Sequence, residues 1–251
     1  MAILKSAPFS TMLSLLRKIT EPCIHIIYPP ICLCCQEYTP ENLKIFCPGC
    51  NDLLTPIEAS ERCPFCFSLD YNTKRRICAY CAKKKRIIYK FASVFDYLGP
   101  AATLVKSLKY SNQFYLSKGS GAHMASYLLN LGWPIPDVII PVPITLTHWL
   151  QRGFNQSRLL ADSMSEILTC PVQEALKRDN LAYSQAELSL KQRLQMKENS
   201  FTLKKKQNLS DKVVLIVDDV STTGTTLNRC AATILPECPT AIYALTLCLA
   251  P

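Results

Sequence analysis

The 251-residue sequence predicts an α/β fold in which helices flank a parallel sheet, with a small cysteine-rich module before it. Two observations support this prediction: strand-like and helix-like segments alternate after residue 90, and four Cys-x-x-Cys pairs lie before residue 82. In such a sheet, ligands collect at the carboxyl ends of the strands. We therefore expect a short N-terminal helix over residues 1–28, the cysteine-rich module over 29–90 and the α/β domain over 91–251.

The N-terminal segment is predicted to form a short amphipathic helix. Its apolar run Ala7–Leu16 ends at Arg17 and Lys18, without the small-residue cleavage site of a signal peptide. No stretch of about 18 uncharged apolar residues occurs in the chain, so the sequence predicts no membrane span.

Eight of the fourteen cysteines form a regular series of Cys-x-x-Cys pairs, with eleven, twelve and eleven residues between successive pairs. Each pair can direct two thiolates at one tetrahedral ion, so two pairs complete a structural zinc site and eight thiolates suit two zinc ions. Thiolate ligation of zinc also suits a reducing cytoplasm. The predicted ligands are Cys32, Cys35, Cys47, Cys50, Cys63, Cys66, Cys78 and Cys81.

The spacing is compatible with two ways of combining these pairs. Neighbouring pairs can combine into a double zinc ribbon, which we favour, or the first pair can combine with the third and the second with the fourth. Structural or redox-active thiols that bind no metal are the alternative to both.

The cysteine-rich part of the chain also carries most of the basic excess. The first 90 residues hold +6 of the net charge of +9, and no acid lies between Asp70 and Asp96. Such a run suits contacts with nucleic-acid phosphates, with tyrosines available for stacking, although a solvated basic face is the alternative. The basic residues are Lys74, Arg75, Arg76, Lys83, Lys84, Lys85, Arg86 and Lys90, and the tyrosines are Tyr71, Tyr80 and Tyr89.

Four strands and four helices are predicted in the α/β domain. Short runs of β-branched and aromatic residues indicate the strands, and longer segments with apolar residues at helical spacing indicate the helices. The strands are Phe91–Leu98, Asp137–Val142, Val213–Val217 and Ala241–Leu249, and the helices are Ala101–Tyr110, Tyr115–Leu131, Asn155–Leu168 and Thr225–Leu235.

The segment after the second predicted strand has the residues of an anion site. Pro141 and Pro143 end the strand, and Arg152 is followed by a glycine and by the start of a helix. Arg152 could offer its forked donors to a pyrophosphate, while Asn155 caps the helix. A proline turn with Phe154 in the core is a compatible alternative.

No buried strand is predicted between Ala175 and Lys212, and this span is rich in lysine and arginine. A long loop in a compact domain is either functional or disordered. This span is therefore either a functional segment or an ordinary surface excursion.

The third predicted strand, Val213–Val217, leads directly into two acids and a loop of small hydroxyl residues. Backbone N–H groups between the end of a strand and the start of a helix bind phosphate. Carboxylates beside such a loop must face hydroxyls or a divalent cation, and a ribose 5-phosphate meets that demand. The residues are Asp218, Asp219, Ser221, Thr222, Thr223, Gly224 and Thr225, and they lack the lysine of a P-loop and the spaced glycines of a dinucleotide fingerprint.

This motif closely resembles the phosphoribosyl-pyrophosphate (PRPP) signature of type I phosphoribosyltransferases. The resemblance implies that Asp218 and Asp219 hold the ribose hydroxyls, that the residues Ser221 to Thr225 hold the 5-phosphate, and that Mg²⁺ accompanies PRPP. It also implies that the span before the PRPP strand closes over the site. Asp218, Asp219 and Arg152 are then the candidate catalytic residues.

Together with the cysteine pairs, Leu-Lys-Tyr at 108–110 and Arg-Gly-Phe-Asn-Gln-Ser at 152–157, the chain resembles the ComF family of competence proteins, which includes GntX-like proteins. The resemblance implies a type I phosphoribosyltransferase-like fold and a cytoplasmic bacterial protein of natural transformation. Its expected partners are single-stranded DNA and other DNA-uptake or recombination proteins. The alternative is a metabolic phosphoribosyltransferase that acts on a nucleobase or amine and releases pyrophosphate.

Overall fold

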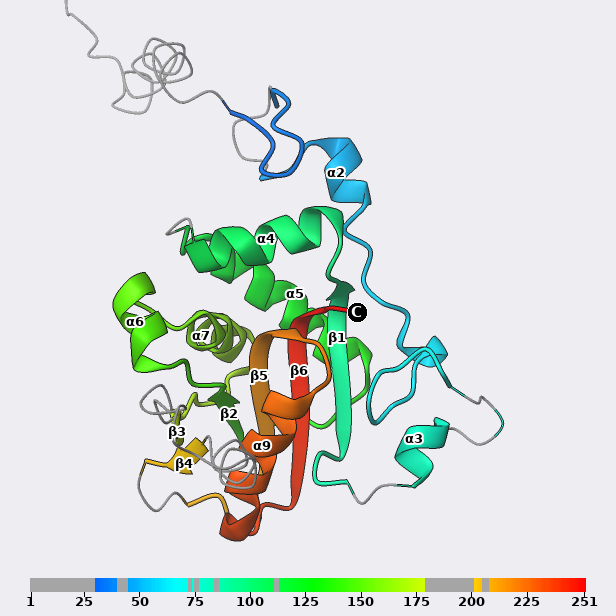
Figure 1. The fold of residues 1–251 in the computed structure, drawn as a ribbon, viewed down its shortest axis with the longest axis vertical. Coiled ribbons are helices and arrows are strands. Elements are labelled where there is room, and N and C mark those ends of the chain that lie inside the picture. Colours follow the sequence, from blue (N-terminus) through cyan, green and yellow to red (C-terminus); the bar gives the residue numbers. More distant parts are fainter. Residues whose placement is uncertain are drawn as a thin grey trace, which may run out of the picture. The chain divides into compact units, whose positions relative to one another are not determined.

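The computed structural model describes residues 30–39, 45–71, 74, 77–83, 86–110, 113–178, 201–204 and 208–251 (Figure 1). The chain divides into two compact units, Met1–Leu53 and Leu54–Pro251. The division falls inside the predicted cysteine-rich module, so the first two Cys-x-x-Cys pairs belong to one unit and the last two to the other. The predicted N-terminal helix lies outside the described residues.

The larger unit is built on a four-stranded parallel sheet, which confirms the predicted fold class. The strands are β1 (Lys90–Asp96), β2 (Val138–Pro141), β5 (Val213–Ser221) and β6 (Ala241–Leu249), in the order β1-β6-β5-β2. Strands that are buried on both faces need continuous apolar runs, and the central strands β5 and β6 are rich in valine, isoleucine and leucine.

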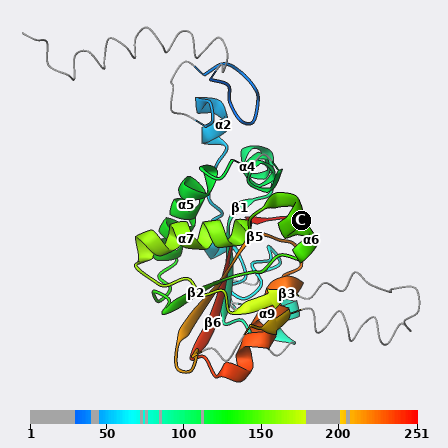
Figure 2. The same ribbon diagram turned by 90° about the vertical axis from the view of Figure 1, so that its left-hand side faces the viewer.

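Helices cover both faces of this sheet. Helices α5 (Leu116–Asn130) and α7 (Gln156–Leu168) pack against each other and against the strands, and α4 (Gly99–Tyr110) packs against β1 and β6. Helix α9 (Thr225–Ile234) packs on β5, and the two views place it across the sheet from α5 and α7 (Figure 2). The loop before α9 therefore opens at the end of a central strand, as the sequence predicts.

Three features differ from the predicted elements. A seven-residue helix, α6 (Leu146–Arg152), follows the two prolines in a segment for which no helix was predicted. A two-stranded antiparallel sheet, β3 (Leu176–Arg178) and β4 (Phe201–Leu203), lies where no strand was predicted. Strand β5 continues to Ser221, so both acids lie within the strand and not after it. Most of the predicted closing segment, residues 179–200 and 205–207, lies outside the described residues.

The part of the larger unit before the sheet is held to it by backbone hydrogen bonds. Strand β1 is an outer strand, and its Val94 carbonyl accepts from the Ile57 N–H at 2.8 Å, while the Phe91 N–H donates to the Pro64 carbonyl at 3.2 Å. The buried Tyr127 hydroxyl of α5 donates to the Ile57 carbonyl at 2.6 Å. The remaining short helices are α2 (Pro48–Asp52), η1 (Ala59–Glu61), α3 (Ala79–Ala82) and η2 (Leu235–Glu237).

None of the helices in the described ranges is both long enough and apolar enough to cross a membrane.

Candidate functional site

The two acids of β5 are held by side chains from different helices. The Asp218 carboxylate accepts from the Ser157 hydroxyl at 2.8 Å and from the Asp219 N–H at 2.9 Å. Asp219 is buried, and its carboxylate pairs with the Lys109 ammonium at 3.0 Å. The ends of α4 and α7 therefore converge on the acid pair.

Burial and the neighbouring charge of Asp219 raise the pKa of Asp218 to about 7, against the opposing hydrogen bond from Ser157. Lys109, which forms an ion pair with Asp219, also lowers the pKa of Asp218, but it does not outweigh burial and the charge of Asp219. Near neutral pH, Asp218 is thus balanced between a carboxylic acid and a carboxylate. A bound cation or a ring of hydroxyl donors would favour its ionised form.

Arg152 lies at the end of α6, immediately before Gly153, which adopts φ 75° and ends the helix. Its guanidinium donates to the Gln156 side-chain oxygen at 3.3 Å and to the Tyr110 hydroxyl at 3.5 Å. Tyr110 follows Lys109 in α4, and Gln156 precedes Ser157 in α7. Arg152 and the acid pair are thus anchored to adjacent residues of the same two helices.

Asn155 caps α7, as the sequence predicts. Its side-chain oxygen accepts from the Ser157 N–H at 3.1 Å, and its amide donates to the Val142 carbonyl at 3.0 Å. Phe154 packs against Phe114 with ring centroids 4.5 Å apart, so the structural and the anion-site interpretations of this segment are compatible. The cap positions Ser157, which in turn holds Asp218.

The hydroxyl loop Ser221–Thr225 ends at α9, whose N-cap is Gly224 with φ 69°. No side chain caps α9 in the described part of the chain, so its first N–H groups stay available to an anion. The Thr223 and Thr225 hydroxyls bond to each other at 2.7 Å, and the Ser221 hydroxyl is buried without a partner among the described residues. Unsatisfied donors beside small hydroxyls fit a phosphate group.

The loop also borders a cavity of about 660 Å³, whose described lining includes Thr222 to Thr225 but none of Asp218, Asp219 and Arg152. The acids are connected to α4 and α7, and the loop to α9. That all of these residues serve one phosphoribosyl ligand remains a prediction.

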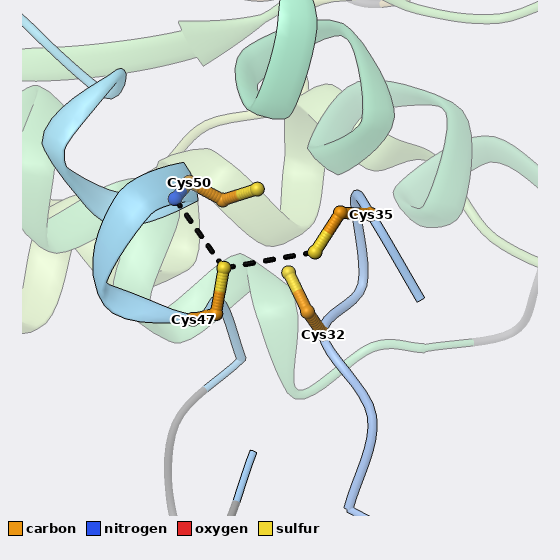
Figure 3. Close-up of side chains that lie close together, drawn as sticks. All are labelled: Cys32, Cys35, Cys47 and Cys50. Carbon is orange, nitrogen blue, oxygen red and sulfur yellow. Dashed lines mark hydrogen bonds between the residues drawn. The ribbon is translucent and has the colours of Figure 1, made fainter. Parts of the chain in front are cut away.

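The cysteine pairs combine as neighbours, which is the arrangement that we favoured from the sequence. The sulfur atoms of Cys32, Cys35, Cys47 and Cys50 lie within 4.8 Å of one another and point toward a common centre (Figure 3). The sulfurs of the last two pairs, Cys63, Cys66, Cys78 and Cys81, form an equivalent cluster.

Both clusters have the dimensions of a zinc site. Sulfur atoms bound tetrahedrally to zinc at about 2.3 Å lie about 3.8 Å apart. The Cys35 and Cys47 sulfurs are 3.6 Å apart, and those of Cys66 and Cys78 are 3.5 Å apart. None of the described cysteines forms a disulfide. The donor set and its size therefore fit one zinc ion in each cluster.

The electrostatics of the clusters also suit a cation. Burial raises the pKa of Cys32, but the backbone N–H groups of Cys35, Cys47 and Cys34 outweigh it and lower the pKa to about 6. Burial, together with hydrogen bonds from neighbouring thiols, raises the pKa of Cys50. Four adjacent thiols cannot all ionise without a positive ion, whereas a divalent metal would stabilise four thiolates.

The two clusters repeat one local structure with a constant offset of 31 residues. In each, the residue after the second cysteine has a positive φ, 64° at Gln36 and 60° at Phe67. In each, the third cysteine caps a short helix, Cys47 for α2 and Cys78 for α3.

The described part of the basic run is exposed except for Lys90, which is half-buried. Lys74, Lys83 and Arg86 face solvent, and Tyr80 and Tyr89 are more than half exposed. The Arg86 guanidinium lies 3.6 Å from the centroid of the Phe65 ring. The basic residues Arg75, Arg76, Lys84 and Lys85 lie outside the described residues.

The sequence did not identify three residues that hold the site. Lys109, Ser157 and Gln156 contact Asp219, Asp218 and Arg152 respectively. All three lie in the two short motifs that carry the family resemblance, so their position in these motifs could have identified them as site residues.

Comparison with known proteins identifies the α/β domain. Residues 155–251 match the model of the phosphoribosyl transferase domain family. Purine phosphoribosyltransferase from Pyrococcus horikoshii is similar over 52% of this chain and 70% of that chain, with 21% identity and a TM-score of 0.34.

Relatives of similar length extend the match over most of the chain. Competence protein F of Haemophilus influenzae is 32% identical over 195 residues, which cover 73% of this chain and 81% of that protein. DNA utilization protein YhgH of Escherichia coli K12 is 31% identical over 192 residues, which cover 74% of this chain and 83% of that protein. With a phosphoribosyl transferase domain behind two four-cysteine clusters, the chain belongs to the ComF family, that of competence protein F and YhgH.

Proposed function

We propose that this chain is a cytoplasmic protein of natural transformation whose α/β domain binds PRPP, or a related phosphoribosyl ligand, together with Mg²⁺. Single-stranded DNA and other DNA-uptake or recombination proteins are its proposed partners. The names of the relatives, competence protein F and DNA utilization protein, support this role. The phosphoribosyl transferase family match supports the ligand.

One observation carries the ligand proposal: two adjacent carboxyls lie near the carboxyl end of a buried strand, which leads through a hydroxyl-rich loop into an uncapped helix start. Asp218 and Asp219 would hold the ribose hydroxyls, and Thr222 to Thr225 would hold the 5-phosphate. Arg152, anchored by Tyr110 and Gln156, would face the pyrophosphate. Mg²⁺, when bound, would screen the phosphate charges.

Zinc in both four-cysteine clusters completes the proposed cofactors. The eight cysteines form two closed tetrahedral donor sets, which is typical of structural sites rather than catalytic ones. We therefore assign zinc a role in folding and not in chemistry.

A metabolic phosphoribosyltransferase is the second candidate, because the family match covers the acid pair, the loop and α9. It would transfer the phosphoribosyl group to a nucleobase or amine. Pyrophosphate release from PRPP with a base would favour this enzyme. Tight binding of single-stranded DNA without release would favour the DNA-uptake role.

The ligand site is tested by replacing both acids, Asp218→Asn with Asp219→Asn, and measuring Mg²⁺-dependent PRPP binding by calorimetry. We expect binding to be lost, because amides do not neutralise a cation and do not replace the charge at the hydroxyls. The matched control is Asp162→Asn, which removes a carboxylate of α7 that pairs with Arg158 and not with the site. Thermal unfolding verifies that both proteins are folded. Undiminished PRPP binding by the double variant would refute the assignment.

A further inference from the structure

The cavity beside the hydroxyl loop lies between the loop and the second four-cysteine cluster. Its volume is about 660 Å³, and all of its described lining belongs to the unit Leu54–Pro251. Phe65, Tyr80 and Arg86 of the cluster region line one part, and Thr222 to Thr225 with Asn228 line another. The cluster region thus forms one wall of a cavity that the hydroxyl loop also lines.

We propose that this cavity binds a 5′-phosphorylated nucleoside, with its phosphate on the hydroxyl loop and its base against the aromatic wall. The proposal rests on the proposed function in one respect, because the same loop would hold the 5-phosphate of PRPP. It differs in the rest of the site, since the acid pair does not line the cavity.

The aromatic wall suits a planar base. Tyr80 is 60% exposed, and the Arg86 guanidinium stacks over the Phe65 ring at 3.6 Å. Bases stack on aromatic rings and on guanidinium planes, and such stacking tolerates any base because every base has a π-face. Phe91, Phe201 and Leu227 add apolar lining.

The opposite part of the lining suits a phosphate. It offers the Thr223 and Thr225 hydroxyls and the start of α9 at Gly224. No aspartate or glutamate occurs among the described lining residues, whereas Arg86 and Arg229 do, and two cysteines of the second cluster, Cys66 and Cys81, also line the cavity. An anion therefore meets donors and positive charge in this cavity without a nearby carboxylate.

The cavity is also large enough for a ligand bigger than a phosphate group. Small-molecule sites occupy about 300–1,000 Å³, and the cavity of about 660 Å³ falls in this range. Hydroxyl and apolar residues together line it, which suits a ligand with one anionic end and one flat apolar part.

The internal repeat shows that the aromatic wall is not required by the metal cluster. At the constant offset of 31 residues, Phe65 corresponds to Cys34 and Tyr80 corresponds to Gly49. The first cluster brings its four sulfurs together without either ring. Of the two clusters, the one that borders the hydroxyl loop therefore has both rings, and the other has neither. This difference fits a role of the rings in binding a ligand rather than the metal.

A free mononucleotide and the 5′-phosphorylated end of a DNA strand share this chemistry. The test uses calorimetric titration of the full-length, metal-containing protein with thymidine 5′-monophosphate, thymidine and 5′-phosphorylated hexathymidylate. Tighter binding of the hexamer than of the mononucleotide would identify a strand end as the source. Equal affinities would identify the free nucleotide.

We expect Tyr80→Ala to weaken binding of thymidine 5′-monophosphate by roughly tenfold, since it removes a stacking surface. Tyr80→Phe should keep the affinity. Tyr89→Ala is the matched control, because Tyr89 is similarly exposed in the same region but does not line the cavity. Equal affinity for thymidine and its monophosphate, or an unchanged affinity in Tyr80→Ala, would overturn the proposal.

The acid-pair variant separates this inference from the proposed function. Asp218→Asn with Asp219→Asn should retain nucleotide binding in the presence or absence of Mg²⁺, while losing PRPP. Loss of both ligands in a folded variant would mean that the nucleotide occupies the PRPP site, and the separate cavity site would be wrong. Nucleotide binding by a wild-type protein that does not bind PRPP would refute only the proposed function.

Discussion

The two four-cysteine clusters have the same local structure but use one equivalent position differently. Gln36 and Phe67 both follow the second cysteine of their cluster with a positive φ. Gln36 is exposed, whereas Phe67 is only 2% exposed and meets the Phe91 ring of β1 at a centroid distance of 6.0 Å. The cysteines form the metal site, and the residues between them determine whether the cluster also packs against other parts of its unit.

The second cluster has become part of the core of the α/β unit. Besides the Phe67 ring, its region contributes the Arg62–Asp96 ion pair at 3.3 Å, in which the Arg62 side chain is only 11% exposed. The position of the first cluster that corresponds to Arg62 is Ile31, which is 44% exposed. The two clusters thus share a local structure but differ in the side chains that pack against the rest of their unit, which shows that similar metal-binding geometry does not imply equal roles.

The largest expected difference is in the thermal stability of two variants that each lose one cluster. Cys63→Ser removes a ligand of the second cluster, and Cys32→Ser removes the equivalent ligand of the first. Both variants should lose one of two zinc ions, measured by elemental analysis. Cys63→Ser should lower the Tm of the α/β unit by roughly 10 °C or more, because a structural metal site contributes folding free energy to the unit that contains it. Cys32→Ser should leave that transition in place. Equal shifts in Tm would contradict the comparison.

A smaller difference is expected at the equivalent turn residues. Phe67→Ala should reduce the free energy of unfolding by about 3–5 kcal/mol, because it removes a buried ring. Gln36→Ala should cost less than about 0.5 kcal/mol, as is usual for an exposed side chain. Each substitution replaces one non-glycine residue by another at a positive φ. The backbone strain is therefore similar in the wild type and the variant and does not contribute to the difference. Urea denaturation of the two variants measures the difference, and a cost at Gln36 equal to that at Phe67 would disprove it.

The smallest expected effect concerns the hydrogen bond from Tyr127 to the Ile57 carbonyl. Tyr127→Phe should cost about 1–3 kcal/mol, because it leaves a buried carbonyl without its donor. Tyr115→Phe, at a residue that is 64% exposed, is the control.

The same variant makes a prediction about pH. Burial, with smaller effects of nearby charges, raises the pKa of Tyr127 to about 12. The unfolded chain releases this proton near pH 10, so stability is fully present below pH 10 and falls as the pH rises toward 12. Tyr127→Phe should show a shallower alkaline loss of stability than the wild type, and an identical loss would count against the buried hydroxyl.

The sequence predicted the features that depend on local patterns. The β-branched runs of β2, β5 and β6 identified the sheet, and the regular cysteine spacing indicated two four-cysteine sites, although the choice of neighbouring pairs was a preference that the spacing did not decide. Asn155 was recognised as a helix cap because its side chain acts within two residues.

The features that the sequence did not predict depend on distant partners. Strand β5 continues through the acids because β6 offers Thr246 and Cys248 as pairing partners, and such a register is not encoded in β5 itself. The Lys109–Asp219 ion pair joins residues 110 positions apart. Strands β3 and β4 each bury one side chain, Leu176 and Phe201, which is too short a pattern to recognise.

Helix α6 is a different case, because local signals for it were present. Thr145 caps it by accepting from the His148 N–H at 3.3 Å, and Gly153 ends it in a left-handed conformation. A threonine followed eight positions later by a glycine marks the two ends of a short helix. The sequence interpretation took the neighbouring prolines to make the segment rigid and predicted no helix there.

The backbone hydrogen bonds that β1 makes with Ile57 and Pro64 have a consequence for solubility. An outer strand with free backbone groups is a template on which another copy of the chain can add a strand, and this is a common route to aggregation. The segment that leads from Leu54 past the second cluster runs beside β1 and occupies its Val94 carbonyl and Phe91 N–H (Figure 1). These two backbone groups of β1 are therefore not available for pairing with a strand of another molecule.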